Sequence, residues 1–332
     1  MRELRIFPMR MKLFKIGLVA IVPLISCLYA GYWFYVAHEL RAGIEPTSEN
    51  LRAQGIDLHW EQAEVEGFPV RFRINLVAPV LTTNYRVTAP SLAASASVWN
   101  LRDWHIDLPQ GAKIDLPLPE SAVHAETVSG MAHLAEGFES RITLAATHIT
   151  GDGAARAVHI DGATLAVTGA DQGTTQRITL ELAGVALEKS TPPFPNMIEQ
   201  ISLDTEIHGP VPSTLKGSGV AAWQAGGGRI DIKNGGLHWG QISVTSKGMF
   251  ALDSELQPEG ELESVIEGQD RLIEAVAASG RMSAQNAKMM LKLFTKPAPE
   301  GGDGVVLSLR LQQHHAYLGP LDLGSIPPIH WE

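Results

Sequence analysis

The segment Ile201–His208 reads ISLDTEIH, with an apolar side chain or threonine at every odd position and a polar side chain at every even one. Successive side chains of a β-strand point to opposite faces, so this alternation predicts a strand with one buried and one solvated face. The same period of two recurs in segments 56–61, 70–76, 141–146, 177–182, 229–233 and 305–311. The chain is therefore expected to form an antiparallel sheet with one apolar face.

Turn-forming clusters separate these segments, among them Gly151–Gly153, Asp171–Gly173 and Gly226–Gly228. Their spacing favours a mainly β fold, an extended antiparallel β-meander or curved sheet, over alternating strand–helix units. The proline-rich stretch 192–195 marks a boundary between two possible halves, 56–191 and 196–332. Together these halves make up a β-rich domain over residues 56–332.

A small helical pair near the C-terminus interrupts the strand pattern. Residues 270–279 end at Gly280, and Ser283 is a suitable N-cap for residues 283–294. We expect the pair to cap the end or the mouth of the sheet. The alternative is that Met289–Met290 offers a soft surface to an apolar ligand.

An uncharged run of 22 residues, Ile16–Ala37, precedes all of this. About 20 apolar residues suffice to cross a bilayer. Five basic residues and one acidic residue stand before the run, so the positive-inside rule predicts a cytoplasmic tail over residues 1–15. Residues 16–37 are then a transmembrane anchor of the inner membrane, and everything beyond lies in the periplasm. The aromatic side chains at its far end are expected at the outer membrane interface: Tyr29, Tyr32, Trp33 and Tyr35.

Two other interpretations of this run stay open. A cleaved signal peptide has an apolar region of 7–15 residues, which is shorter than this one. Lipidation at Cys27 is suggested by the preceding Leu24–Ser26, although the chain continues apolar after it. After the anchor, residues 38–55 are expected to form a membrane-proximal helix that is interrupted at Pro46.

Charge restricts the partners of the domain beyond the anchor. The whole chain has a net charge of −10, and the residues after 37 carry 21 basic and 35 acidic side chains, a net charge of −14. An acidic surface does not attract nucleic acid or anionic lipid head groups. The expected partners are the membrane, through a single anchor, and either a lipid-like apolar ligand or other envelope proteins.

No arrangement of residues with catalytic chemistry is found in the sequence. The single cysteine excludes a disulfide framework and a cysteine metal cage. The segment His38–Ala42 begins like a zinc-protease motif but lacks the second histidine, and Gly217–Gly219 lacks the spacing of a nucleophile elbow. We therefore expect no catalytic residue, no metal ligand and no cofactor, and a protein that is not an enzyme.

The most distinctive local motif is Gly67–Arg73, which reads GFPVRFR. It predicts a hairpin corner in which Phe68 anchors the turn while Val70 and Phe72 enter the core. The sharper alternative is an entry point for a ligand beside the membrane. The candidate residues of a ligand-binding or structural apolar face are Trp60, Phe68, Pro69, Val70, Phe72, Ile74 and Trp239.

Several segments resemble a family of uncharacterised Gram-negative envelope proteins, known only as a domain of unknown function with one N-terminal anchor. The most specific are Gly67–Arg73 and Leu318–Ile329. Others are Leu51–Gly55, Ala89–Leu92, Trp99–Asn100 and Gly236–Gly240. A looser resemblance to AsmA-like envelope proteins rests on Gly248–Leu262 and the helix after it. The first resemblance implies no assigned catalytic residue, and the second implies lipid handling between membranes.

These observations lead to one functional hypothesis and one alternative. We expect a non-enzymatic periplasmic protein, anchored in the inner membrane, that shields or transfers a lipid-like apolar ligand. If the sheet instead buries its apolar face completely on itself, the chain is better explained as a structural or assembly factor for other envelope proteins.

Overall fold

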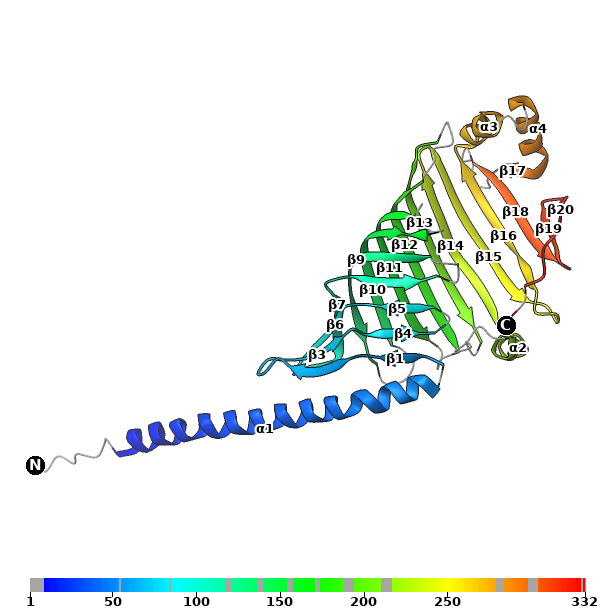
Figure 1. Ribbon diagram of the computed structural model, residues 1–332. Coiled ribbons are helices and arrows are strands. Elements are labelled where there is room, and N and C mark those ends of the chain that lie inside the picture. The colour runs from blue at the N-terminus through cyan, green and yellow to red at the C-terminus, as the bar shows by residue number, and fades with distance from the viewer. Residues whose placement is uncertain are drawn as a thin grey trace, which may run out of the picture.

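The computed structural model describes residues 9–53, 55–83, 85–116, 121–135, 140–153, 158–170, 174–187, 194–209, 217–278, 283–297, 304–329 and 331. In residues 9–23, and at some positions in α3, α4 and the strands, only the backbone is described. Within these ranges the chain forms one long helix, a 20-stranded sheet and three short helices (Figure 1).

The helices are α1 (Met9–Ala53), α2 (Gly217–Ala225), α3 (Gln269–Ala278) and α4 (Ala284–Phe294). The first ten strands are β1 (Asp57–His59), β2 (Gln62–Glu66), β3 (Arg71–Val77), β4 (Val80–Thr82), β5 (Arg86–Thr88), β6 (Ser91–Ser97), β7 (Asn100–Leu108), β8 (Ala112–Asp115), β9 (Ala122–His133) and β10 (Arg141–Gly151). The next ten are β11 (His159–Ala170), β12 (Thr175–Ala186), β13 (Met197–His208), β14 (Arg229–Trp239), β15 (Ile242–Leu252), β16 (Pro258–Glu267), β17 (Thr295–Pro297), β18 (Val305–Gln312), β19 (His315–Leu318) and β20 (Leu321–Ser325).

The sheet is antiparallel and forks at β9. The first part of β9 pairs with β8 and the second part with β7. Two limbs therefore leave the same edge, one through β7, β6 and β3 to β2, the other through β8, β5 and β4 to β1. From the opposite edge of β9 the sheet continues as a meander from β10 to β16, and then through β18 and β19 to β20. The expected mainly β fold with one extended antiparallel meander is confirmed.

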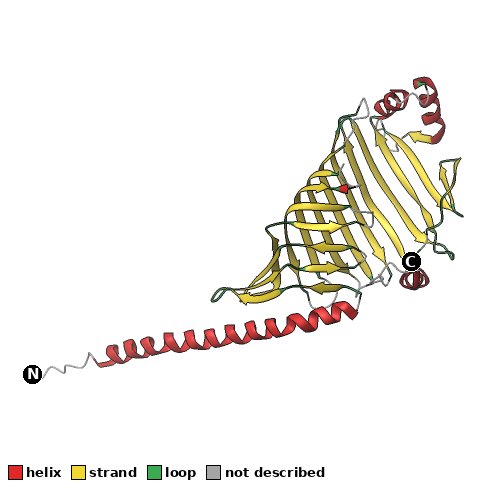
Figure 2. Cartoon of the chain, viewed as in Figure 1, coloured by secondary structure: helices red, strands yellow, loops and turns green. Residues whose placement is uncertain are grey.

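A row of interrupted pairings bends the long strands. The register on either side of this row is unchanged, but the opposed residues within it do not pair: Glu126, His148, Asp161, Gly184 and Glu199. His148 and Gly184 have positive φ angles of 47° and 63°. Such local irregularities bend and twist strands. Figures 1 and 2 show the result, a sheet curved along its length rather than flat.

The bend keeps the apolar residues on the concave side. Thr147 and His148 are both exposed, whereas Ile149 is buried, so the alternation shifts by one residue at the row. Apolar pairing then resumes on the far side, where Ile149 faces Ile160 and Val185 faces Ile198. Without this shift, the apolar side chains beyond the bend would point to the solvated face.

Helix α1 closes the two limbs at one end of the sheet, where it contacts β1 and β2. The core there is formed by Trp33 and Ala37 of α1, Val65 and Phe72 of the sheet, and Val98 in the turn between β6 and β7. Phe72 is the largest fully buried side chain among the described residues. Trp33 stacks on it with ring centroids 5.3 Å apart, and its indole nitrogen donates to the carbonyl of Arg71 at 3.1 Å.

Helix α1 differs from the expectation at two places. It runs through Pro46 without interruption, and the hydroxyls of Thr47 and Ser48 donate to the carbonyls of Gly43 and Glu45 within the same helix. Trp33, expected at the membrane interface, is buried against the sheet. The interpretation from sequence treated residues 29–37 as part of the anchor alone and missed this sheet contact.

Among the described residues, no helix combines the length and the hydropathy that crossing a membrane requires. The side chains of residues 1–23 lie outside the described part of the chain; they include the tail expected in the cytoplasm and the start of the expected anchor.

The other helices lie at the two ends of the strands (Figure 1). The expected C-terminal pair is confirmed as α3 and α4, and Leu272 of α3 packs on a small core of Phe194 and Ile242. At the opposite strand ends, α2 buries Val220 and Trp223. The expected boundary at 192–195 falls between β12 and β13, which pair from one end to the other except at Gly184 and Glu199.

Candidate functional site

The concave face of the sheet carries a row of four leucines in adjacent strands. Leu144 lies opposite Leu165, Leu165 opposite Leu180, and Leu180 opposite Leu203. Directly opposed residues of antiparallel strands project to the same face. We call these four residues the leucine row.

The leucine row is part of a longer line that crosses thirteen strands. Cross-strand pairs connect, in order, Val65, Ile74, Ala94, Ile106, Gly130, Leu144, Leu165, Leu180, Leu203, Gly235, Ser246, Ser264 and Leu307. At about 4.8 Å between strands, this line is roughly 58 Å long. Gly130 has no room for a side chain, because a Cβ there would lie 2.3 Å from the backbone oxygen of Thr143 and 2.7 Å from Cδ2 of Leu144.

Lines parallel to the leucine row on either side of it are also apolar. One connects Ile142, Val167 and Ile178, and another connects Ala163, Leu182 and Ile201. The residues between these lines project to the convex face and are mostly small or polar, as in the line Thr143, Ala166, Thr179, Asp204 and Asn234. The sheet therefore has one apolar and one polar face over most of its length.

The middle of the apolar face is open to solvent. None of the leucine row is buried, and Leu165 and Ile142 remain 37% and 42% exposed. In the described part of the chain, the helices lie at the ends of the sheet and none crosses its middle (Figure 2). The chain exposes 21462 Å², whereas a compact monomer of this mass exposes roughly 13,000 Å². None of the described residues forms a covering layer over the middle of the apolar face.

A cavity of about 300 Å³ lies toward the β20 end of this face, beneath α2. Its wall is built from aliphatic and aromatic side chains: Ile207, Val220, Trp223, Ile230, Phe250, Leu252, Ile329 and Trp331. The indole nitrogens of Trp223 and Trp331 donate to the carbonyls of His208 and Leu256, at 2.7 and 2.9 Å. Because backbone carbonyls satisfy both indoles, the two rings add apolar surface to the wall and the cavity suits an apolar group.

The C-terminal segment is held beside this cavity by one side chain. The amide of Gln257, which is 8% exposed, donates to the carbonyl of Ile329 at 3.1 Å and accepts from its N–H at 2.7 Å. Two hydrogen bonds to one residue fix its backbone much as a neighbouring strand would. Gln257 thus positions Ile329 and Trp331 in the cavity wall.

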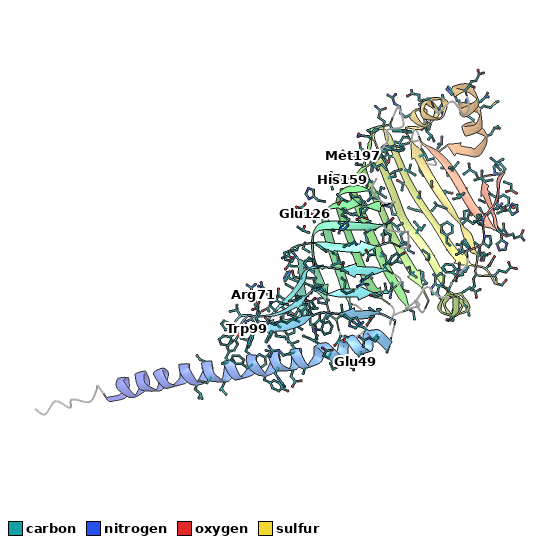
Figure 3. All side chains as sticks on the ribbon, viewed as in Figure 1. Glu49, Arg71, Trp99, Glu126, His159 and Met197 are labelled. Carbon is teal, nitrogen blue, oxygen red and sulfur yellow. The ribbon has the colours of Figure 1, made fainter. Side chains whose placement is uncertain are left out.

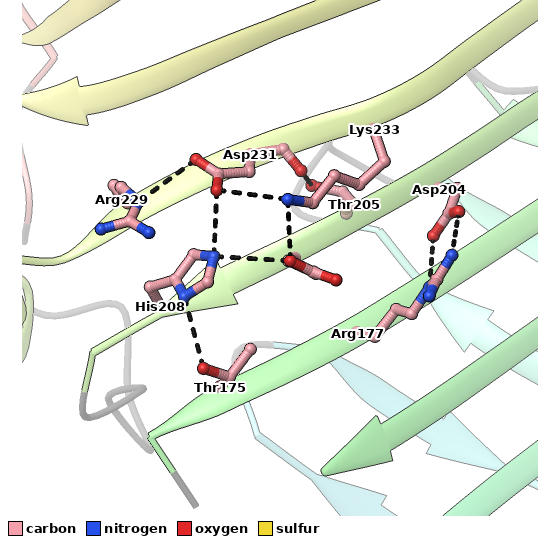
Figure 4. Close-up of polar contacts among 9 residues, drawn as sticks. Thr175, Arg177, Asp204, Thr205, His208, Arg229, Asp231 and Lys233 are labelled. Atoms are coloured by element: carbon pink, nitrogen blue, oxygen red, sulfur yellow. Dashed lines mark hydrogen bonds and ion pairs between the residues drawn. The ribbon is translucent and has the colours of Figure 1, made fainter. Parts of the chain in front are cut away.

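The convex face carries networks of ion pairs instead (Figure 4). Nε2 of His208 lies 3.1 Å from Asp231 and 3.6 Å from Glu206, and Nζ of Lys233 lies 2.9 Å from Glu206. Burial acts to raise the pKa of Asp231, but Arg229, His208 and Lys233 outweigh it, and the pKa is lowered. The hydrogen bond to Glu206 raises the pKa of Lys233.

This cluster brings three possible metal ligands together, since one ligand atom each of Glu206, His208 and Asp231 lies within 4.8 Å of the others. Lys233 and Arg229 already supply positive charge at these carboxylates. The cluster is therefore explained as an ion-pair network on the polar face.

The structure divides the sequence-predicted site residues between two places. Phe72 and Ile74 belong to the core at α1, with Phe68 and Pro69 in the adjoining turn. Trp60 is half-buried between β1 and β2. Trp239 lies far from them, stacked on Phe194 at 4.3 Å. Val70 does not enter the core as expected but is 62% exposed, because β3 begins only at Arg71.

The leucine row was not among those candidates. Leu144, Leu180 and Leu203 each belong to a separate alternating segment, and Leu165 belongs to none of the segments identified from the sequence. What brings them together is the register between strands, which a single alternating segment does not encode. The cavity residues Trp223 and Trp331 were also missed, because α2 and the C-terminal segment carry no strand pattern.

The fold and this site define a class of protein: an N-terminal helix joined to one long curved sheet that leaves its apolar concave face open. The family model described as "Uncharacterized protein conserved in bacteria (DUF2125)" matches residues 33–327, and the chain belongs to this family. The expected membership of an uncharacterised bacterial family is thus confirmed. No curated protein and no solved structure matches the chain.

Proposed function

We propose that this protein is a non-enzymatic lipid-binding protein of the bacterial envelope, with α1 anchored in the inner membrane and the sheet in the periplasm. The open apolar face along the leucine row is the observation that carries the proposal. Contiguous apolar surface of this extent is rare on soluble monomers and marks a binding site. Covering about 1,000 Å² of it contributes on the order of 25 kcal/mol of hydrophobic free energy.

The shape of the face favours acyl chains over a compact ligand. It is long, aliphatic side chains line its middle, and the ion-pair networks lie on the opposite side of the sheet. A hydrocarbon chain requires no hydrogen bonds, and each methylene group that it buries contributes about 0.8 kcal/mol of hydrophobic free energy. The looser likeness to AsmA-like envelope proteins agrees with this, as a fold-level analogy.

The anchor and the location rest on the sequence. Ile16–Ala37 has no charged residue, and the basic residues precede it. This arrangement supports a cytoplasmic N-terminus and a periplasmic sheet. An alkaline-phosphatase fusion after residue 60 tests the orientation: it is active if residue 60 is periplasmic, and inactivity rejects the proposed location.

The alternative function, an assembly factor with no ligand, requires a sheet that buries its own apolar face. The exposure of Leu165 favours the lipid-binding proposal over this alternative. To test the proposal, the full chain is purified from bacterial envelopes and its bound lipids are extracted and counted. Leu165→Gln with Leu203→Gln should lower the count several-fold, whereas Ala166→Gln on the convex face should not. Equal counts for all three proteins would reject lipid binding at this face.

A further inference from the structure

The end of the sheet beside α1 carries an exposed apolar surface. Its members are large side chains that project outward: Phe34, Tyr35, Phe68, Val70 and Trp99, between 50% and 80% exposed. They are contiguous with α1, since Phe68 stacks on Phe34 at 5.6 Å and Trp99 stacks on Tyr29 at 5.9 Å. We call this surface the tip patch; Figure 3 shows Trp99 at the end of the sheet beside the helix.

The same contacts shorten the part of α1 that is free to span a membrane. The hydroxyl of Tyr29 donates to the carbonyl of Pro69, and Trp33 and Ala37 are 4% and 6% exposed against the sheet. Residues 29–37 therefore lie alongside the tip of the sheet. Of the expected span, only residues 16–28 remain clear of it.

Those thirteen residues are too few to cross a bilayer. At 1.5 Å per residue they extend roughly 20 Å, whereas the hydrocarbon core is about 30 Å thick. If the tip of the sheet stayed in water, uncharged residues of α1 would be drawn out of the hydrocarbon. The mismatch disappears when residues 29–37 enter the membrane together with the sheet tip that packs on them.

We infer that the tip patch is inserted in the outer leaflet of the membrane that α1 spans, with the phospholipid bilayer as its partner. The composition suits this place, because tryptophan and tyrosine favour the membrane interface. The exposed Arg71, next to the turn, is positioned for lipid phosphates. The inference rests on the proposed anchor and places the α1 end of the concave face at the leaflet.

Spin labels on the full chain in vesicles of phosphatidylethanolamine and phosphatidylglycerol test this. All labels are attached in a Cys27→Ala background, and the measured quantity is the ratio of the collision rate with oxygen to that with an aqueous nickel chelate. This ratio should be several-fold higher for labels at Val70→Cys and Trp99→Cys than for a label at Glu181→Cys on the convex face. Both substituted tip side chains are exposed, so the fold should tolerate the labels. If the labels at the tip give the same ratio as the label at Glu181→Cys, the inference is overturned.

The lipid count of the same purified chain separates this inference from the proposed function. Tip labels in water together with bound lipid would reject membrane insertion and leave lipid binding intact. Tip labels at membrane depth without bound lipid would support insertion and reject the binding role. A Leu28→Cys label in water would reject the anchor and, with it, the inserted tip.

Discussion

Leu165 of β11 lies directly opposite Leu180 of β12 in the middle of the sheet, and neither side chain is buried. Two large aliphatic residues in a central pair normally contribute to a core. Here they line a surface whose covering layer is absent from the described chain. Their role is therefore better explained by binding than by stability. The two contributions can be measured separately.

Leu165→Gln should change the free energy of unfolding by less than about 1 kcal/mol, because surface substitutions away from buried contacts have small effects. Chemical denaturation of the full chain in detergent measures this. Ala166→Gln, the next residue on the other face, is the matched control. A loss of several kcal/mol for Leu165→Gln alone would show that the leucine row is part of a closed core.

Phe72→Ala should destabilise the chain by about 3–5 kcal/mol, because it removes a fully buried ring and leaves a cavity beneath Trp33. The fluorescence of Trp33 should shift toward that of an exposed indole. Phe68→Ala, four residues earlier and 50% exposed, should cost far less. Equal costs for the two substitutions would contradict the assignment of Phe72 as the residue that joins α1 to the sheet.

Gly184→Ala should destabilise the bend by at least about 1–2 kcal/mol. The backbone there has a φ of 63°, which disfavours any Cβ, and the new Cβ would lie 2.1 Å from a carboxylate oxygen of Asp161. Gly162→Ala is the control, because its Cβ would meet only the carbonyl of Ala146 at 3.8 Å. If thermal unfolding shows the two variants to be equally stable, the row of interrupted pairings does not depend on Gly184.

The ion pair between Arg177 and Asp204 should make a pH-dependent contribution to stability. The hydrogen bond from Arg177, at 2.8 Å from its Nε, lowers the pKa of Asp204 below its ordinary 3.8, although burial acts in the opposite direction. A lowered pKa in the folded state stabilises the fold above 3.8, and this contribution is lost as the pH falls through the folded-state value.

Asp204→Asn should therefore cost about 0.2–1 kcal/mol at neutral pH, the range of a partly exposed pair, and progressively less below 3.8. Denaturation curves at a series of pH values measure the difference. In an Arg177→Gln background the pH dependence of this difference should shrink. A cost that stays constant down to strongly acidic pH would rule out the pairing.

Much of the fold follows from local pattern. Ile201–His208 alternates because it belongs to a two-faced strand, and it is found within β13. Gln269–Ala278 has an apolar stripe at helical spacing, and it forms α3. In both cases the period of the side chains determines the structure without information from distant residues.

Other features depend on contacts between distant residues. The fork at β9 and the packing of Trp33 on Phe72 join segments whose sequences show no sign of each other. The bend is visible in the sequence at one place, because the apolar residue Ile160 is at an even position and Ala163 and Leu165 are at odd ones. Such a shift in the alternation does not by itself distinguish a bend from a turn. Pro46 was misread because the rule that proline ends a helix ignores tertiary packing. Ile44 before it packs on the core, and Ser48 after it is buried.

Photo-cross-linking in living bacterial cells is the most direct test of whether the concave face binds acyl chains. The photoreactive residue p-benzoylphenylalanine replaces Leu165 on the concave face or Ala166 on the convex face, and acyl chains are labelled with radioactive acetate. The account predicts that the protein acquires label after irradiation when the probe is at 165 and acquires little when it is at 166. Label that is absent at 165, or equal at both positions, would contradict it.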